Sequence, residues 1–173
     1  ARLVDQWVTQ IGETVGTTYS KVNRRGLALD IPMPGEIKDG MNELVCGLDV
    51  SSSVDMRRLM GFLANLEKLR DIVGIKMIHI VPFEYAIKLA DIKHVTRGQP
   101  IPRHYDIGGG TRFSPLFNWQ RRFAKNADAI IVFTDMGSND YGRKPRCPVL
   151  WASSDPVLYA PPFGRAIEIE TAG

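Results

Sequence analysis

Five oxygen-bearing side chains in three short segments are the residues of this chain best suited to chemistry. Their positions are Asp49, Ser51 and Ser53 in the run LDVSSS, Thr111 at the end of GGGT, and Asp135 at the end of IIVFTD. Carboxylate and hydroxyl oxygens are hard ligands, of the type that Mg²⁺, Mn²⁺ and Ca²⁺ prefer. The pattern therefore predicts a divalent cation site made of oxygen ligands.

Such a site would leave its cation electrophilic. Three of the five side chains are neutral hydroxyls, and only the two aspartates carry charge. Because few anionic oxygens would neutralise the ion, a carboxylate from another protein can complete its coordination. We expect Mg²⁺ (or Mn²⁺ or Ca²⁺) as the cofactor and a protein with an acidic side chain as the partner. Asp and Ser at a strand-to-helix junction also serve as caps and turn formers, so a purely structural role is the alternative.

The elements that must position these residues are read from the apolar pattern. Short apolar runs predict strands at 43–50, 75–81, 129–133, 149–152 and 166–169, with a further edge strand at 84–90. Residues 91–110 contain prolines and glycines and are predicted to form an irregular loop.

Two helices separate the predicted strands. Apolar residues recur at three- and four-residue steps from Leu59 to Val73, with Ser52 or Ser53 as the expected N-cap and Gly74 as the stop. A second helix is predicted for 113–125, with a proline in its first turn. Strands that alternate with helices indicate an α/β fold with a mostly parallel central sheet flanked by helices.

This topology predicts that the five side chains meet. Ligands of open α/β sheets bind beyond the carboxyl ends of the parallel strands. Asp49 and Asp135 each stand at the end of a predicted strand, and Thr111 lies in the loop that enters the second helix. Three distant segments therefore converge at one edge of the sheet.

The chain is expected to have two parts. Residues 3–15 have a helical apolar period, and the segment up to residue 40 is rich in glycine and proline. We expect an N-terminal helix and extended arm over 1–40, followed by the α/β domain over 41–173. The first residue is Ala1, and we expect the chain to be a fragment of a longer protein.

Composition limits the classes of function. The net charge of +3 is too small to indicate nucleic acid by itself. No apolar run approaches the roughly 20 residues that cross a bilayer, so no membrane partner is expected. Cys46 and Cys147 are too few for a disulfide scaffold, and a reducing, cytoplasmic setting is expected.

Several motifs together resemble one known family. They are TYSKVNRR (18–25), LDVSSS (48–53), GGGTRFSPLF (108–117), FTDMGS (133–138), CPVLWAS (147–153) and PPFGRAIEI (161–169). The chain resembles a von Willebrand factor A (VWA) domain, and in particular the VWA-like domain at the C-terminus of a bacterial and phage metallopeptidase family. PVLW followed by PPFG is distinctive of that group. Val50 and Ser52 depart from the small or glycine residues that are frequent at those positions.

The resemblance implies a Rossmann-like sheet with a metal-ion-dependent adhesion site (MIDAS). In such sites the serines and the threonine usually touch the ion, and the aspartates usually act through water. The family's peptidase activity belongs to an upstream zinc-binding helix. This chain has no HExxH sequence, so it is not expected to be an enzyme by itself. The resemblance also suggests a MoxR-type AAA+ ATPase as a partner.

Further residues are candidates for partner contact. Gly110 and Arg112 flank Thr111, and a basic loop is expected near the carboxyl edge, where it can steer an acidic partner; it holds Arg143, Lys144 and Arg146.

Two other functions stay open. A Mg²⁺-dependent phosphoryl-transfer hydrolase would use Asp49 as its nucleophile, although Ser51 stands where such sites usually carry a second acid. A nucleic-acid-binding module would use the basic arm at 18–25.

Overall fold

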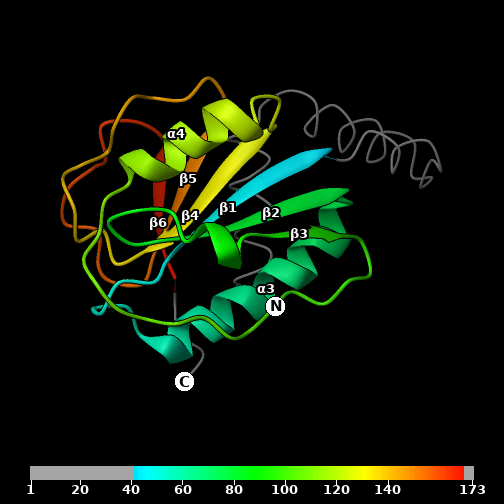
Figure 1. The fold of residues 1–173 in the computed structure, drawn as a ribbon, viewed down its shortest axis with the longest axis horizontal. Helices are drawn as coiled ribbons and strands as arrows, with labels where there is room; N and C mark the ends of the chain where they lie inside the picture. The colour runs from blue at the N-terminus through cyan, green and yellow to red at the C-terminus, as the bar shows by residue number, and fades with distance from the viewer. Residues whose placement is uncertain (1–40, 170–173) are drawn as a thin grey trace, which may run out of the picture.

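The computed structural model describes residues 41–169 of the 173-residue chain. The predicted helix at 3–15 and arm up to residue 40 lie outside the described residues. A six-stranded sheet forms the centre of the described part, in the order β3-β2-β1-β4-β5-β6 (Figure 1). The strands are β1 (Glu43–Asp49), β2 (Met77–Phe83), β3 (Lys93–Thr96), β4 (Ala129–Thr134), β5 (Val149–Ser153) and β6 (Arg165–Glu168). All neighbouring strands pair in parallel except β2 and β3.

Two helices cover opposite faces of the sheet, α3 (Met56–Val73) and α4 (Ser114–Phe123) (Figure 1). Because successive strand residues point to opposite faces, β1 contributes to two cores. Leu44 and Leu48 pack in the cluster that contains α3, whereas Val45 packs in the cluster that contains α4. The expected α/β fold with a mostly parallel sheet between helices is therefore confirmed.

Helix α3 begins later than the serine motif predicts. Its N-cap is Asp55, whose carboxylate accepts a hydrogen bond from the backbone N–H of Arg57 at 2.8 Å, rather than Ser52 or Ser53. The physical reason is a separate turn before the helix, closed by a hydrogen bond from the N–H of Val54 to the carbonyl of Ser51 at 3.1 Å. This turn leaves the serine hydroxyls free of a capping role.

The end of α3 is as predicted. Gly74 caps the helix with a φ of 74°, a left-handed conformation that favours glycine, and its N–H donates to the carbonyl of Arg70.

The edge strand is not where the sequence pattern predicts it. Residues 84–90 do not extend the sheet, because the chain turns back sharply at Phe83, which bridges to Ile87, and then forms a short 3₁₀ helix at Leu89–Asp91. The edge strand is β3, which lies inside the segment predicted as irregular loop, and strand β2 runs two residues further along the chain than its prediction.

Cys46 and Cys147 are both free, with Cys46 buried in β1 and Cys147 half-buried before β5. Neither helix within residues 41–169 combines the length and apolar character that crossing a membrane requires.

Candidate metal centre

Asp49 lies at the centre of the candidate site, and hydrogen bonds hold its carboxylate in place. It is the last residue of β1, and its side chain is fully buried. Its Oδ1 accepts a hydrogen bond from the backbone N–H of Ser51 at 3.0 Å, and its Oδ2 accepts one from the hydroxyl of Thr134 at 2.6 Å. The carboxylate is thus held in one orientation by both neighbouring segments.

The electrostatics of Asp49 favour a cation close by. Burial raises the pKa of its carboxyl group, the hydrogen bonds from Ser51 and Thr134 oppose that effect, and the charge of Asp135 raises the pKa further. The buried carboxylate of Asp49 and the half-buried carboxylate of Asp135 repel each other, and both would gain from a divalent cation between or beside them.

The two serines lie at the spacing of adjacent ligands. The turn after β1 brings the Oγ atoms of Ser51 and Ser53 to 3.4 Å, with Ser51 buried and Ser53 exposed. Thr111 Oγ1 lies 3.5 Å from each carboxylate oxygen of Asp49. When two metal–oxygen bonds form an angle near 90°, the two ligand oxygens are separated by roughly 3 Å around Mg²⁺ and about 3.4 Å around Ca²⁺. The residues present therefore fit a divalent cation.

Backbone hydrogen bonds hold the Thr111 loop against the serine turn. The N–H of Ser52 and its hydroxyl both donate to the carbonyl of Gly109 at 3.1 Å. The N–H of Gly108 donates to the carbonyl of Val50 at 2.9 Å. These bonds explain how Thr111, which is 62 positions from Asp49 in the chain, reaches its carboxylate.

Two of the three glycines before Thr111 lie against the turn that follows β2. A Cβ added to Gly109, which has a φ of 73°, would lie 2.3 Å from Oε2 of Glu84. A Cβ added to Gly110 would lie 2.3 Å from the ring of Tyr85. Gly109 and Gly110 therefore make room for side chains after β2, whereas a Cβ on Gly108 would have nothing within 4 Å.

Asp135 reaches the site from β4. It directly follows the strand, is half-buried, and accepts a hydrogen bond from the N–H of Gly137 at 2.9 Å. The buried Thr134 beside it accepts a hydrogen bond from the N–H of Met136, a residue with a φ of 64°. Sequence reasoning missed Thr134, although a hydroxyl at the last position of a buried strand beside an acidic residue is a usable signal.

Asp140 is a second missed residue, and it anchors the loop on the far side of Thr111. Its carboxylate accepts hydrogen bonds from Nε of Arg112 at 2.7 Å and from the hydroxyl of Ser114 at 2.6 Å, and the bond from Ser114 and then that from Arg112 lower the pKa of Asp140. Its backbone carbonyl also accepts from the N–H groups of Phe113 and Ser114. Asp140 therefore fixes the start of α4 next to the Thr111 loop.

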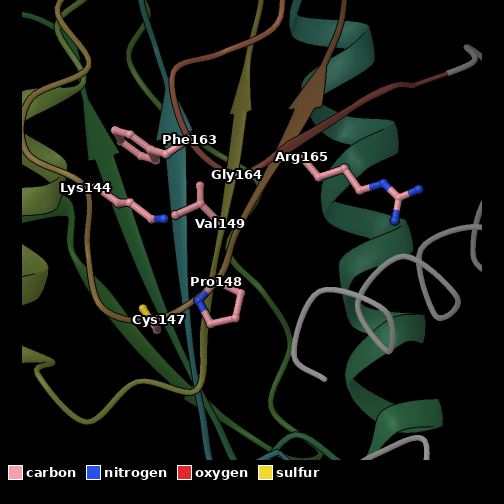
Figure 2. A pocket seen from close by; sticks show the side chains of 7 residues that line it. All are labelled: Lys144, Cys147, Pro148, Val149, Phe163, Gly164 and Arg165. Atoms are coloured by element: carbon pink, nitrogen blue, oxygen red, sulfur yellow. The ribbon is translucent and has the colours of Figure 1, made fainter. Parts of the chain in front are cut away.

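The candidate partner contacts fall into two groups. Gly110 and Arg112 flank Thr111, and Arg112 is exposed although it pairs with Asp140. The basic loop lies elsewhere: the carbonyl of Arg143 accepts a hydrogen bond from Arg121, near the end of α4. Lys144 lines a pocket of about 280 Å³ together with the start of β5, as Figure 2 shows.

This position corrects the expectation that the basic loop borders the carboxyl edge. The connection from β4 must return to the amino end of the parallel strand β5, so its later residues, including Arg146 three positions before β5, run away from the Asp49 edge.

Acidic and soft ligands alone do not form this site. Among residues 41–169, no group of three or more His, Cys, Asp or Glu side chains is suited to hold a metal ion. A cation at this edge therefore depends on the hydroxyls of Ser51, Ser53 and Thr111.

One family model matches the chain, described as VWA-like domain (DUF2201), over residues 44–170. The match begins within β1 and passes the end of β6, so it includes every segment of the candidate site. No curated protein matches the chain.

Proposed function

The chain belongs to the VWA-like domain family, and from this premise we propose that it is a metal-dependent protein-interaction domain. A divalent cation at the carboxyl edge of the sheet captures a carboxylate of a partner protein. The observation that carries the proposal is the convergence of the β1 turn and the Thr111 loop, with hydroxyl and carboxylate oxygens 3.4–3.5 Å apart.

Each residue has a distinct role in this proposal. The hydroxyls of Ser51, Ser53 and Thr111 hold the ion, and Asp49 and Asp135 act through hydrogen bonds and water. When bound, the ion supplies a Lewis-acidic centre for a carboxylate oxygen. Asp49 orients the turn by accepting the N–H of Ser51, and the Oγ atoms of Ser51 and Ser53 in this turn lie 3.4 Å apart.

The hydrolase alternative is less favoured by the position of Asp49. A nucleophilic carboxylate needs an oxygen that can approach a phosphoryl group. Asp49 is fully buried, and its Oδ2 already accepts a 2.6 Å hydrogen bond from Thr134. The nucleic-acid alternative depends on the arm at 18–25, which lies outside the described residues.

The partner in this proposal is a protein with an accessible Asp or Glu, and the family resemblance suggests a MoxR-type AAA+ ATPase. A reducing, cytoplasmic setting is part of the proposal, since both cysteines are free.

Carboxylate capture can be tested with acetate and Mn²⁺, because bound Mn²⁺ accelerates the nuclear relaxation of a carboxylate that coordinates it. The Mn²⁺-loaded 173-residue chain should accelerate the relaxation of the acetate carboxyl carbon, and the effect should disappear with EDTA. Ser51→Ala should weaken Mn²⁺ binding and reduce the effect at least tenfold at fixed metal, because a direct ligand is lost.

Ser52→Ala is the matched control, because this serine lies in the same turn but its hydroxyl points to the carbonyl of Gly109, and its backbone N–H keeps its own 3.1 Å bond to that carbonyl when the hydroxyl is removed. It should retain the acetate effect. Mn²⁺ binding without any acetate effect, or equal losses in Ser51→Ala and Ser52→Ala, would contradict the proposed function.

A further inference from the structure

An exposed aromatic ring lies directly beside the loop that carries Thr111. The side chain of Tyr85 is 61% exposed. Its ring nevertheless lies so close to Gly110 that a Cβ there would come within 2.3 Å of both the Cζ and the hydroxyl of the tyrosine. Tyr85 is thus exposed to solvent and at the same time packed against the residue next to a predicted metal ligand.

The backbone holds Tyr85 rigidly at this position. It stands at the tip of a tight turn closed by the bridge between Phe83 and Ile87, and the N–H of Glu84 donates to the carbonyl of Ala86 across the same turn. Two further bonds tie the turn to the site: the N–H of Val50 donates to the carbonyl of Phe83, and the N–H of Arg112 donates to the carbonyl of Glu84. The backbone of Tyr85 is therefore held at a defined position relative to the serine turn and Thr111.

The charged groups beside the ring are already paired within the chain. The carboxylate of Glu84 lies 3.8 Å from Nζ of Lys88, and Arg112 is paired with Asp140 at 2.7 Å. The apolar face of Tyr85 is therefore an exposed contact surface next to the cation site. A tyrosine side chain has only two rotatable χ angles and loses little conformational entropy on binding, and such residues often anchor protein interfaces.

We propose that Tyr85 selects the partner sequence, by packing against an apolar side chain next to the acidic residue that the cation captures. The inference rests on the proposed function and adds specificity to it. Gly110 and Thr111 are consecutive, with Cα atoms about 3.8 Å apart. Because the ring packs against Gly110, the neighbour of Thr111, we expect it to meet a partner residue close in sequence to the captured acidic residue.

Two capped peptides test this preference: acetyl-Gly-Asp-Leu-Gly-amide and acetyl-Gly-Asp-Ser-Gly-amide. Their affinities are measured by how well each displaces acetate from the Mn²⁺-loaded chain. The wild type should bind the leucine peptide roughly fivefold more tightly, since contact with Tyr85 removes apolar surface from water. Tyr85→Ala should bind both peptides equally, and Tyr85→Phe should keep the preference.

Phe123→Ala is the matched control, because Phe123 is also 61% exposed but ends α4, where the chain leads to the amino end of β4. It should retain the fivefold preference. Equal binding of both peptides by the wild type, or a preference that persists in Tyr85→Ala, would overturn the role of Tyr85 and leave carboxylate capture intact. Failure of both peptides to displace acetate from the metal would instead count against the proposed function itself.

Discussion

The carboxylate of Asp49 illustrates how much of the site depends on single residues. It is buried at the end of a central strand and is bonded to a backbone N–H and to the hydroxyl of Thr134. Burial raises its pKa despite these bonds, so the charged form is unfavourable in the metal-free fold. A buried charge with this cost is what a bound cation would relieve.

The raised pKa of Asp49 has a definite consequence for stability in the absence of metal. The folded state holds the proton more tightly than the unfolded chain, for which the reference value is 3.8. The contribution of Asp49 to the free energy of unfolding should therefore fall as pH rises above about 4. In EDTA, wild type should lose stability relative to Asp49→Asn between pH 4 and pH 7, as measured by urea unfolding.

The difference between the two proteins removes the titration of all groups that do not interact with Asp49 from this comparison. If the wild type instead became more stable relative to Asp49→Asn as pH rises, the hydrogen bonds to Asp49 would have a larger effect on its pKa than burial has, and the prediction would be wrong.

Residues of the site differ in how visible they are in the sequence. Asp49, Ser51, Ser53, Thr111 and Asp135 were predicted because they stand at strand ends or helix entries, and the structure brings the serine turn and Thr111 to Asp49. Tyr85 and Glu84 were not, because their positions depend on a tight turn that the apolar pattern did not reveal. Their contacts with Gly109 and Gly110 form only in the tertiary structure. A run of glycines in the sequence does not indicate which side chains pack against it.

At the scale of elements, α4 is positioned by its first turn. Phe113, the residue before the helix, makes no side-chain capping bond, and Asp140 supplies the acceptors from another loop. Helix N-termini carry unsatisfied N–H groups, and an acidic side chain there is stabilising. The loop with Thr111 leads directly into this helix, so the anchor also steadies the predicted metal ligand.

Loss of the Asp140 anchor should destabilise the fold modestly. Asp140→Ala should lower the free energy of unfolding by about 1 kcal/mol, the usual value for lost side-chain hydrogen bonds, since its carboxylate accepts from Arg112 and Ser114; chemical denaturation measures the change. The lowered pKa of Asp140 means that its stabilisation is present above about pH 4 and is lost as pH falls below that value. Asn139→Ala changes an exposed neighbour and should have little effect.

A loss for Asp140→Ala that stayed constant down to pH 2 would show that its charge contributes nothing.

A Gly→Ala substitution should change the free energy of unfolding in opposite directions at two positions. Gly61 lies exposed in the middle of α3 with nothing within 4 Å of an added Cβ, whereas a Cβ on Gly47 of β1 would lie 2.4 Å from Leu116 of α4. Gly61→Ala should raise the free energy of unfolding by about 0.5–1 kcal/mol through helix propensity. Gly47→Ala should lower it by about 1–3 kcal/mol through overpacking.

Thermal unfolding measured by circular dichroism distinguishes these outcomes. An unchanged melting temperature in Gly47→Ala would mean that α4 does not pack against β1 as closely as the structure shows.

At the scale of the whole molecule, the fold was largely predictable because its central strands are apolar along their length. All six residues of β4 are buried, as expected for a strand covered by a helix on each side. The prediction failed at the edge of the sheet, where strand β3 has only one buried residue and no clear apolar period. The position of the basic loop was also missed, because the sequence does not say how a long connection returns to the start of β5.

The central claim is that the oxygen cluster at the carboxyl edge binds a divalent cation, and calorimetric titration of Mg²⁺ and Mn²⁺ into the 173-residue chain tests it most directly. The account predicts saturable binding of one ion per chain in the wild type and no binding in a folded Asp49→Ala variant. A folded wild type that binds neither ion, or an Asp49→Ala variant that binds as tightly as the wild type, would contradict it.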